Sequence, residues 1–219
     1  MTQRIICLLI GYAFGLFQTS YIYGKIHGVD IRTKGSGNAG TTNALRTFGK
    51  LGGFLTALGD VMKCILAVIV IWLIYRNTQA DIIKLLKIYA SAGVILGHNF
   101  PFYLKFRGGK GIAATCGMIL AFLDWHLILI GAILFFASIA ITKFVSVGSL
   151  TLSACFLIGV IVSGQLGVYS MTQASLIEMY IIVALLTLMA FIKHRGNISR
   201  LLHGNERKLS FKKSGTDEP

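Results

Sequence analysis

A glycine-rich turn with two cations, near the middle of the sequence, contains residues that could do chemistry. It reads Phe106-Arg107-Gly108-Gly109-Lys110-Gly111. Glycine lets the backbone adopt positive φ angles and bring N–H groups close to a ligand, and the two cations add positive charge beside them. This combination suits a phosphate group, although a charged loop at a membrane face is the alternative from these residues alone. The turn is not a nucleotide P-loop, because a glycine rather than Ser or Thr follows Lys110.

A second polar stretch, residues 34–46, has a similar character. Its glycines alternate with Ser, Asn and Thr, and a helix starting near Thr41 would point the positive end of its dipole at a bound anion. Arg46, about a turn and a half along, can make a forked contact with phosphate. The structural alternative is a turn with a helix cap at Ser36 or Thr41. Binding is favoured, because polar glycine-rich backbone at a membrane needs a ligand or a cavity to satisfy it.

A third polar stretch follows the last apolar run and reads His194-Arg195-Gly196-Asn197-Ile198-Ser199-Arg200, with His203 and Glu206 beyond it. His194 and Asn197 are three residues apart, so they share one helical face and can line one pocket. By itself the stretch would be a basic interfacial flank. Glu206 is expected to be structural and to tie the tail to an arginine.

Three other polar residues in apolar surroundings are also expected to be structural. Asp60 and Lys63, at i and i+3 inside an apolar run, are predicted to form an ion pair near the inner face, although an ionisable pair in a membrane is a functional candidate by default. His98 is predicted to be a helix cap or a hydrogen-bonding spacer. No set of residues has metal-site spacing, so no metal is expected. Without an obvious activated nucleophile, direct transfer between two bound substrates is preferred.

The composition indicates an integral membrane protein. The chain has 219 residues, of which 55% are hydrophobic and 13% charged, and its mean hydropathy is +0.73. Soluble domains are about one-quarter charged. The net charge of +13 lies in short loops beside apolar runs, where cations orient a membrane protein and hold anionic head groups, so no nucleic-acid partner is expected. The four cysteines are expected to be small buried hydrophobes.

About seven transmembrane helices are predicted, in a single all-α polytopic domain over residues 1–219. The apolar stretches are 5–23, 52–75, 80–97, 112–122, 125–142, 145–166 and 175–192. The third is the weakest because Lys84 and Lys87 lie near its start, and the fourth and fifth are divided at Leu123-Asp124 because together they exceed one span. Residues 24–50 are predicted to be a polar loop, 197–202 a short amphipathic piece and 203–219 a flexible basic cytoplasmic tail.

Loop charge predicts the orientation, with the N-terminus outside and the C-terminus in the cytoplasm. In that topology Arg4 and Arg76 lie outside, and sixteen Lys and Arg residues lie in the inner loops and tail. All three polar stretches then lie on the cytoplasmic face.

The three polar stretches together resemble the motifs of the bacterial acyl-phosphate:glycerol-3-phosphate acyltransferases, the PlsY family. The matching residues are Gly35-Ser36-Gly37-Asn38-x-Gly40-x-Thr42-Asn43-x-Leu45-Arg46, Gly97-His98-x-Phe100-Pro101 with Gly108-Gly109-Lys110-Gly111, and His194-Arg195-x-Asn197-Ile198-x-Arg200-Leu201-x-x-Gly204-x-Glu206. Two departures are Cys64, where the family usually has Gly, and Ala114, where it usually has Thr. They affect local packing at most.

The resemblance implies transfer of a fatty acyl group from acyl phosphate to the sn-1 hydroxyl of glycerol 3-phosphate. The products would be lysophosphatidate and inorganic phosphate, in the first acylation step of phospholipid synthesis, without a cofactor, CoA or acyl carrier protein. The location would be the bacterial cell (inner) membrane, with the active site on the cytoplasmic face and membrane lipids around it. The chain lacks the His-x-x-x-x-Asp motif of acyltransferases that use acyl-CoA or acyl carrier protein on this acceptor.

The resemblance also implies a role for each motif. The predicted catalytic residues, around the acceptor phosphate, are Ser36, Arg46, Lys110, His194 and Asn197. The glycine loops are predicted to bind substrate, the donor phosphate above all, through Gly35, Gly37, Asn38, Gly40, Thr42, Asn43, Gly108, Gly109 and Gly111. Either a substrate phosphate or His194 would accept the hydroxyl proton.

Two other functions are weighed against this one. A transporter of a small anionic solute would place its binding groups near the bilayer midplane and often show an inverted repeat, whereas the groups here lie at the inner edge. A lipid-head-group binder without enzymatic activity would tolerate Arg46→Lys, whereas a bidentate clamp would not.

Overall fold

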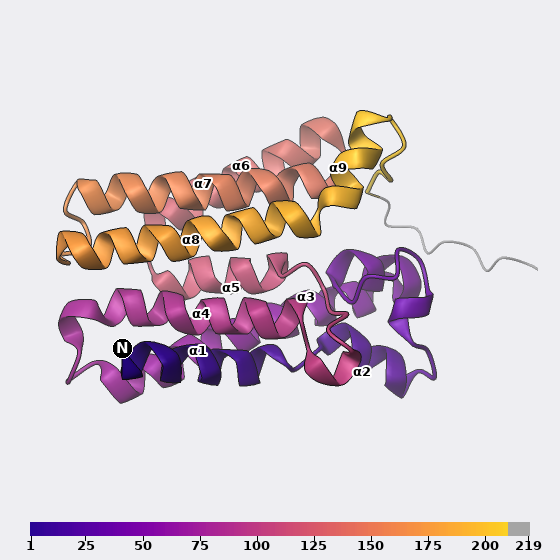
Figure 1. Ribbon diagram of the computed structural model, residues 1–219. Coiled ribbons are helices and arrows are strands. Elements are labelled where there is room, and N and C mark those ends of the chain that lie inside the picture. Colours follow the sequence, from indigo (N-terminus) through magenta and orange to yellow (C-terminus); the bar gives the residue numbers. More distant parts are fainter. Residues whose placement is uncertain (210–219) are drawn as a thin grey trace, which may run out of the picture.

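The computed structural model describes residues 1–209, which form helices and turns without a β-strand in that range (Figure 1). The α-helices are α1 (Thr2–Gly15), α2 (Thr19–Ile26), α3 (Thr41–Tyr75), α4 (Ile83–Asn99), α5 (Ile112–Phe122), α6 (Trp125–Thr142), α7 (Val145–Gln165), α8 (Gln173–Lys193) and α9 (Arg195–Leu202). Short 3₁₀ helices are η1 (Ile31–Thr33), η2 (Ala80–Ile82) and η3 (Phe102–Leu104). The predicted all-α integral membrane fold is confirmed.

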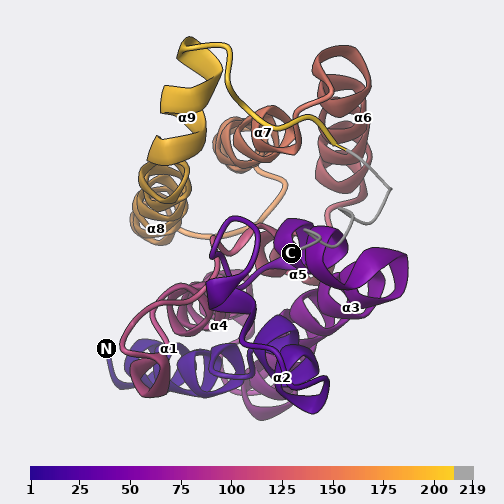
Figure 2. The same cartoon turned by 90° about the vertical axis from the view of Figure 1, so that its right-hand side faces the viewer.

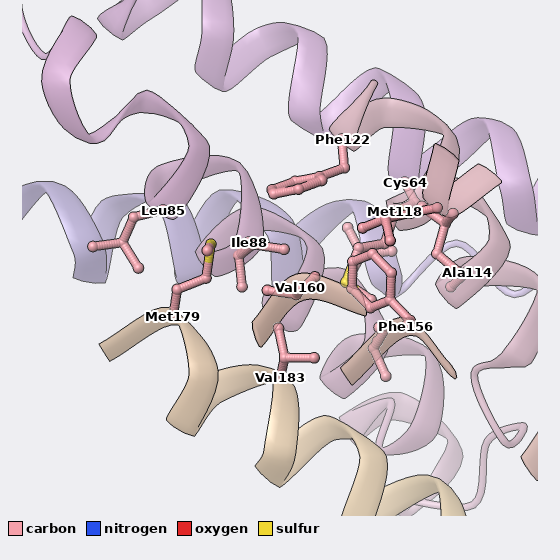
Figure 3. Packing of buried hydrophobic residues seen from close by; sticks show 14 of the residues in the cluster. Cys64, Leu85, Ile88, Ala114, Met118, Phe122, Phe156, Val160, Met179 and Val183 are labelled. Atoms are coloured by element: carbon pink, nitrogen blue, oxygen red, sulfur yellow. The ribbon is translucent and has the colours of Figure 1, made fainter. Parts of the chain in front are cut away.

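The long helices lie side by side in two groups with α5 between them. Figure 2 looks along the bundle, with α1 to α4 on one side of α5 and α6 to α9 on the other. The closest helix pairs are α1 with α4, α3 with α5, and α6 with α7. The buried core joins both groups, and Figure 3 shows Cys64 and Ile88 from the first group near Phe156 and Val183 from the second.

Glycines bring α1 and α4 into backbone contact. Gly11 and Gly15 on α1 face Gly93 and Gly97 on α4, each pair with the four-residue spacing of a GxxxG motif. A Cβ atom built on Gly93 would lie 2.1 Å from the carbonyl oxygen of Leu8. Only glycine permits so close an approach. This pair therefore forms a rigid base for the loop that follows α4.

Within residues 1–209, five segments are long and apolar enough to cross a membrane, if α1 and α2 are taken together. They are Thr2–Ile26, Thr41–Tyr75, Trp125–Thr142, Val145–Gln165 and Gln173–Lys193. Helix α4 has 17 residues, and α5 has 11, which is about 16 Å of helix. The predicted division between α5 and α6 is confirmed, because Asp124 caps α6 by accepting a hydrogen bond from the Leu127 amide at 3.4 Å.

The structure corrects two predicted boundaries near the N-terminus. The first span is interrupted at residues 16–18, where the buried Gln18 donates to the carbonyl oxygen of His98 at 3.1 Å. The predicted polar loop 24–50 contains η1 and the first ten residues of α3, residues 41–50. Helix α3 begins at Thr41, as predicted, and its backbone is broken at Gly49, where φ is 79°.

The tail that was predicted to be flexible is only partly described. Residues 203–209 run back from α9 to the turn between α6 and α7, where the Leu209 amide donates to the Lys143 carbonyl at 2.8 Å. They are therefore held against the helices by hydrogen bonds. The remainder of the predicted tail, residues 210–219, lies outside the described residues.

Candidate functional site

One cavity of about 740 Å³ gathers residues from all three polar stretches. It lies at the end of the bundle where α3, α5 and α9 begin and where α4 and α8 end (Figure 1). All five predicted catalytic residues line it: Ser36, Arg46, Lys110, His194 and Asn197. The fold thus brings together groups that are more than 150 residues apart in the chain.

Three helix N-termini open onto this cavity. Thr41 and Thr42 of α3, Ile112 and Ala113 of α5, and Gly196 and Asn197 of α9 all belong to its lining. None of these helices has a side-chain cap, since the capping positions are Gly40, Gly111 and a non-capping His194. Uncapped N–H groups and the positive ends of three helix dipoles therefore face the same space, which favours anions.

The first loop is shaped by glycine and held by Asn43. Gly35 and Gly37 have φ angles of 58° and 70°, which side-chain-bearing residues rarely adopt. The buried Asn43 accepts from the Ser36 amide at 2.8 Å and donates to the carbonyl oxygens of Ile31 and Lys34. Asn43 reaches the cavity wall, but its amide group is engaged in positioning the loop.

Cations predominate among the charged side chains of the cavity. Its charged lining residues are Arg46, Lys110, Lys193, Arg200, Arg207, Asp60 and Glu206. Lys110 donates a hydrogen bond to the Oδ1 atom of Asn197. Burial, reinforced by the nearby Arg200 and Arg46 and opposed by Glu206, lowers the pKa of Lys110 to about 8. Bound anions would relieve this crowding of positive charge.

His194 lies in the wall as a neutral imidazole with one nitrogen already engaged. Its Nδ1 atom is 2.7 Å from the Ala190 carbonyl oxygen, so Nδ1 carries the proton and Nε2 is an acceptor. Burial and then the neighbouring Lys110 lower the pKa of His194 to about 4. The prediction that His194 and Asn197 face one pocket is confirmed.

Glu206 closes the wall between α9 and α7. It accepts from Asn197 Nδ2 at 2.6 Å, Arg200 Nε at 2.8 Å and Ser146 Oγ at 3.2 Å. Burial raises its pKa, but the bonds from Asn197 and Arg200 outweigh burial and hold the pKa of Glu206 below its ordinary value. The predicted tie to an arginine is confirmed. Glu206 also fixes the amide of Asn197, so that Oδ1 faces Lys110.

The predicted ion pair between Asp60 and Lys63 is present, at 2.8 Å, and both side chains are buried. His98 is also buried and lies within hydrogen-bonding distance of Lys63. It belongs to the last turn of α4 and is not a cap. Asp60 and His98 belong to the cavity lining, which sequence reasoning did not predict.

The central glycine loop needs one correction. Gly111 lines the cavity, whereas Gly108 and Gly109 do not, and their amides donate to the carbonyls of Asn99 and His98. A Cβ atom on Gly108 would lie 2.0 Å from the His98 carbonyl oxygen. These two glycines therefore permit close packing on the end of α4. Their N–H groups are not available to a ligand in this conformation.

The sequence analysis missed several residues of the wall. Ser146 and Ser149 of α7 line the cavity, but small hydroxyl residues in an apolar run carry no signal of a site. Lys193, Arg200 and Arg207 also line it. Lys193 and Arg207 were counted only as orienting charges, because basic residues after a span are usual in membrane proteins. Arg200 was noted in the third polar stretch but was given no role.

Part of the cavity lining is apolar. It is formed by Ala57, Val61, Ile112, Ala113, Cys116, Phe135 and Val145. These residues come from α3, α5, α6 and the start of α7. The cavity can therefore hold a molecule with an anionic head and an apolar portion.

Comparisons with known proteins agree on one family. The family model described as "Glycerol-3-phosphate acyltransferase" matches residues 5–204. The glycerol-3-phosphate acyltransferase of Clostridioides difficile is 42% identical over 95% of this chain and 97% of its own. That of Thermosipho melanesiensis is 36% identical over 94% of this chain and 92% of its own.

A solved structure supports the same family. A crystal structure of PlsY, described as an integral membrane glycerol 3-phosphate acyltransferase in the glycerol 3-phosphate form, superposes with a TM-score of 0.81. The two chains are 25% identical, and the match covers 94% of this chain and 96% of the other.

Proposed function

This chain belongs to the glycerol-3-phosphate acyltransferase family, and from that premise we propose that acyl phosphate is its acyl donor and lysophosphatidate its product. The observation that carries the proposal is the cavity, whose lining combines cations and three helix N-termini with apolar residues. Such a site suits two phosphate-bearing substrates, one of them with a fatty chain. The absence of the His-x-x-x-x-Asp motif from the sequence supports a donor other than acyl-CoA.

The acceptor phosphate is assigned to a group of cationic and polar residues in the cavity lining. Arg46 would supply a forked contact, and Lys110 and Asn197, which already touch each other, would supply further hydrogen bonds. Ser36 also lines the cavity. The solved PlsY in its glycerol 3-phosphate form is consistent with an acceptor site in this fold.

The donor phosphate is assigned to the first glycine loop and to the start of α5. Gly35, Gly37, Asn38, Gly40 and Thr42 line the loop side of the cavity, and Gly111 with Ile112 lines the α5 side. Backbone N–H groups and helix dipoles would hold the phosphate. Its acyl chain would then extend along the apolar wall toward lipid.

The reaction needs no covalent intermediate on the enzyme. The acceptor hydroxyl oxygen forms a bond with the acyl carbon, and the bond from that carbon to the phosphate oxygen breaks. The bonding electron pair leaves with the phosphate, and the hydroxyl proton ends on phosphate. Holding the two substrates together removes much of the entropic barrier.

A substrate phosphate is proposed as the proton acceptor. A phosphate monoester has a second pKa of about 6, whereas the pKa of His194 is about 4. The phosphate is therefore the stronger base. His194 would instead orient the hydroxyl through its Nε2 atom.

The proposed location is the bacterial cell membrane, with the cavity on the cytoplasmic face. Multiple apolar helices make the protein a multi-pass membrane protein. The distribution of loop cations supports the orientation. Glycerol 3-phosphate would enter from the cytoplasm, and the acyl donor and product would exchange with the lipid.

The test is phosphate release from palmitoyl phosphate by the purified protein in detergent, with and without glycerol 3-phosphate. Wild type should release phosphate only with the acceptor, and Lys110→Ala should lose at least about 100-fold in rate. Lys50→Ala removes an exposed cation outside the cavity and should behave as wild type. If folded wild type transfers the acyl group from acyl-CoA but not from palmitoyl phosphate, the proposed donor is wrong.

A further inference from the structure

The buried His98 lines the cavity and has one ring nitrogen without a hydrogen-bond partner in the described part of the chain. It is only 2% exposed, yet it forms part of the cavity lining. Its Nε2 atom makes no hydrogen bond within residues 1–209, and it is not among the fully enclosed unpaired atoms of that part of the chain. By contrast, both amide atoms of the neighbouring Asn99 are enclosed. His98 Nε2 is therefore a polar atom within reach of a ligand.

The hydrogen bonds of Lys63 determine which nitrogen of His98 carries the proton. The Lys63 ammonium lies 2.8 Å from each of three acceptors: Asp60 Oδ1, the Phe17 carbonyl oxygen and His98 Nδ1. An ammonium group has three N–H donors and no acceptor, so His98 Nδ1 must accept. The ring is then neutral, with its proton on Nε2. His98 thus offers a hydrogen-bond donor without a charge.

This donor is held in place from two directions. Its ring is anchored by Lys63, which pairs with Asp60, and Asp60 in turn accepts from Thr19 Oγ1 at 3.1 Å. The backbone carbonyl oxygen of His98 accepts hydrogen bonds from Gln18 Nε2 and from the Gly109 amide. A donor fixed in this way needs little reorganisation when charge develops in front of it.

Gly109 packs against the imidazole ring of His98. A Cβ atom on Gly109 would lie 2.1 Å from His98 Nε2. Any residue with a side chain at this position would therefore clash with the nitrogen. Lys110 and Gly111, which line the cavity, follow directly in the chain.

We infer that His98 is a catalytic residue whose Nε2–H group donates a hydrogen bond to the acyl carbonyl oxygen as it gains negative charge. Cations and helix N-termini are assigned to the phosphates, which leaves the neutral donor of His98 for the carbonyl oxygen. The step itself is unchanged: the hydroxyl oxygen bonds to the acyl carbon, the electron pair of the broken bond leaves with phosphate, and phosphate takes the proton. This role rests on the proposed acyl transfer.

Two substitutions of His98 distinguish the donor at Nε2 from the bond between Nδ1 and Lys63. His98→Asn keeps a polar atom near Nδ1, where it can accept from Lys63, but removes the group at Nε2. His98→Gln places an amide near Nε2 and restores a donor. Loss of an oxyanion-stabilising donor lowers kcat by about 10²–10³-fold. We expect that loss for His98→Asn, and a loss of at most about tenfold for His98→Gln.

An alkyl phosphate, which resembles the acyl donor but has no carbonyl group, is used as an inhibitor to measure binding of the phosphate and the chain alone. In His98→Asn its inhibition constant and the KM for glycerol 3-phosphate should change by less than about threefold while kcat falls. A kcat equal to that of wild type would overturn the inference. Equal weakening of alkyl phosphate binding and of kcat would also overturn it, because His98 would then contact phosphate.

Further measurements keep the test independent of variant folding. Nitrogen-15 spectra of histidine-labelled wild type should show His98 with a proton on Nε2, and a proton on Nδ1 would contradict the inference. The melting temperature of each variant reports whether it folds. If wild type shows no acceptor-dependent acyl transfer, the proposed function itself fails. If wild type is active and only the His98 results disagree, the failure is confined to this inference.

Discussion

At the scale of single residues, Lys110 gives the site a pH dependence. Its pKa is lowered from 10.5 to about 8, chiefly by burial. Burial disfavours the charged form, so the cation reduces the stability of the folded protein below about pH 8, and this penalty is relieved as the pH rises toward 10.5. Binding of an anionic substrate needs the charged form. The charged form of Lys110 therefore favours anion binding but lowers the stability of the folded protein.

We predict that kcat/KM for glycerol 3-phosphate falls about tenfold per pH unit above about pH 8, because kcat/KM reports the free enzyme. Lys110→Arg should move this alkaline limb above pH 10, since a guanidinium stays charged there. Its maximal rate should nevertheless be lower, because the fork does not reproduce the ammonium geometry. An alkaline limb that stays in place in Lys110→Arg would assign it to another group. Rates of acyl phosphate hydrolysis without enzyme provide the baseline.

At the scale of elements, the glycine contact between α1 and α4 supports the loop that carries Lys110. Gly93→Ala would place a methyl group 2.1 Å from the Leu8 carbonyl oxygen and 2.7 Å from the Tyr12 amide nitrogen, both backbone atoms. Such overpacking costs about 1–3 kcal/mol. We predict a lower melting temperature in detergent, together with lower activity, because the end of α4 would move.

Gly131→Ala is the matched control for this prediction. The added methyl carbon would lie 3.1 Å from its nearest neighbour, the Cδ1 atom of Leu152, which is at the flexible end of a side chain. The control should melt within a few degrees of wild type. If both variants melt at the same temperature as wild type, the backbone contact between α1 and α4 does not limit stability.

Periodicity and composition predicted most of the elements, but not the packing. Helices α5 and α6 were predicted with the bounds that the structure shows, because the cap Asp124 marks the boundary between them. The break in the first span depends on bonds from Gln18 to the distant end of α4, which no local pattern reveals. The GxxxG spacing on α1 and α4 was visible in the sequence and could have predicted their contact.

The sequence predicted which residues line the candidate site better than it predicted the contacts that each of them makes. Motif residues such as Ser36 and Asn197 do meet in one cavity. The different roles of Gly109 and Gly111 follow from which backbone groups face α4, and the unpaired Nε2 of His98 follows from the bond of its Nδ1 to Lys63. Such relations are set by tertiary structure. They are not encoded in residue type and spacing alone.

At the scale of the whole molecule, the two ends of the bundle differ in charge. The end with the cavity carries the polar loops and α9, and the opposite end carries Arg4 and the turn at Arg76 (Figure 1). We predict that the cavity end faces the cytoplasm.

In a background without native cysteines, Arg76→Cys should react with a membrane-impermeant maleimide in intact spheroplasts. Lys50→Cys should react only after lysis. Both positions are exposed, so a difference in labelling reports on the side of the membrane. The reverse pattern would invert the proposed topology.

The joining of distant segments in one cavity has a consequence for biosynthesis. Ser36 and Asn197 are 161 residues apart (197 minus 36). At synthesis rates of about 5–20 residues per second, roughly 8 to 32 s pass between their translation. During that interval the first cationic loop is already made, but the segment that completes the cavity wall is not. A nascent chain that has not reached residue 197 therefore cannot assemble the complete cavity lining, and a chain terminated before that residue never acquires it.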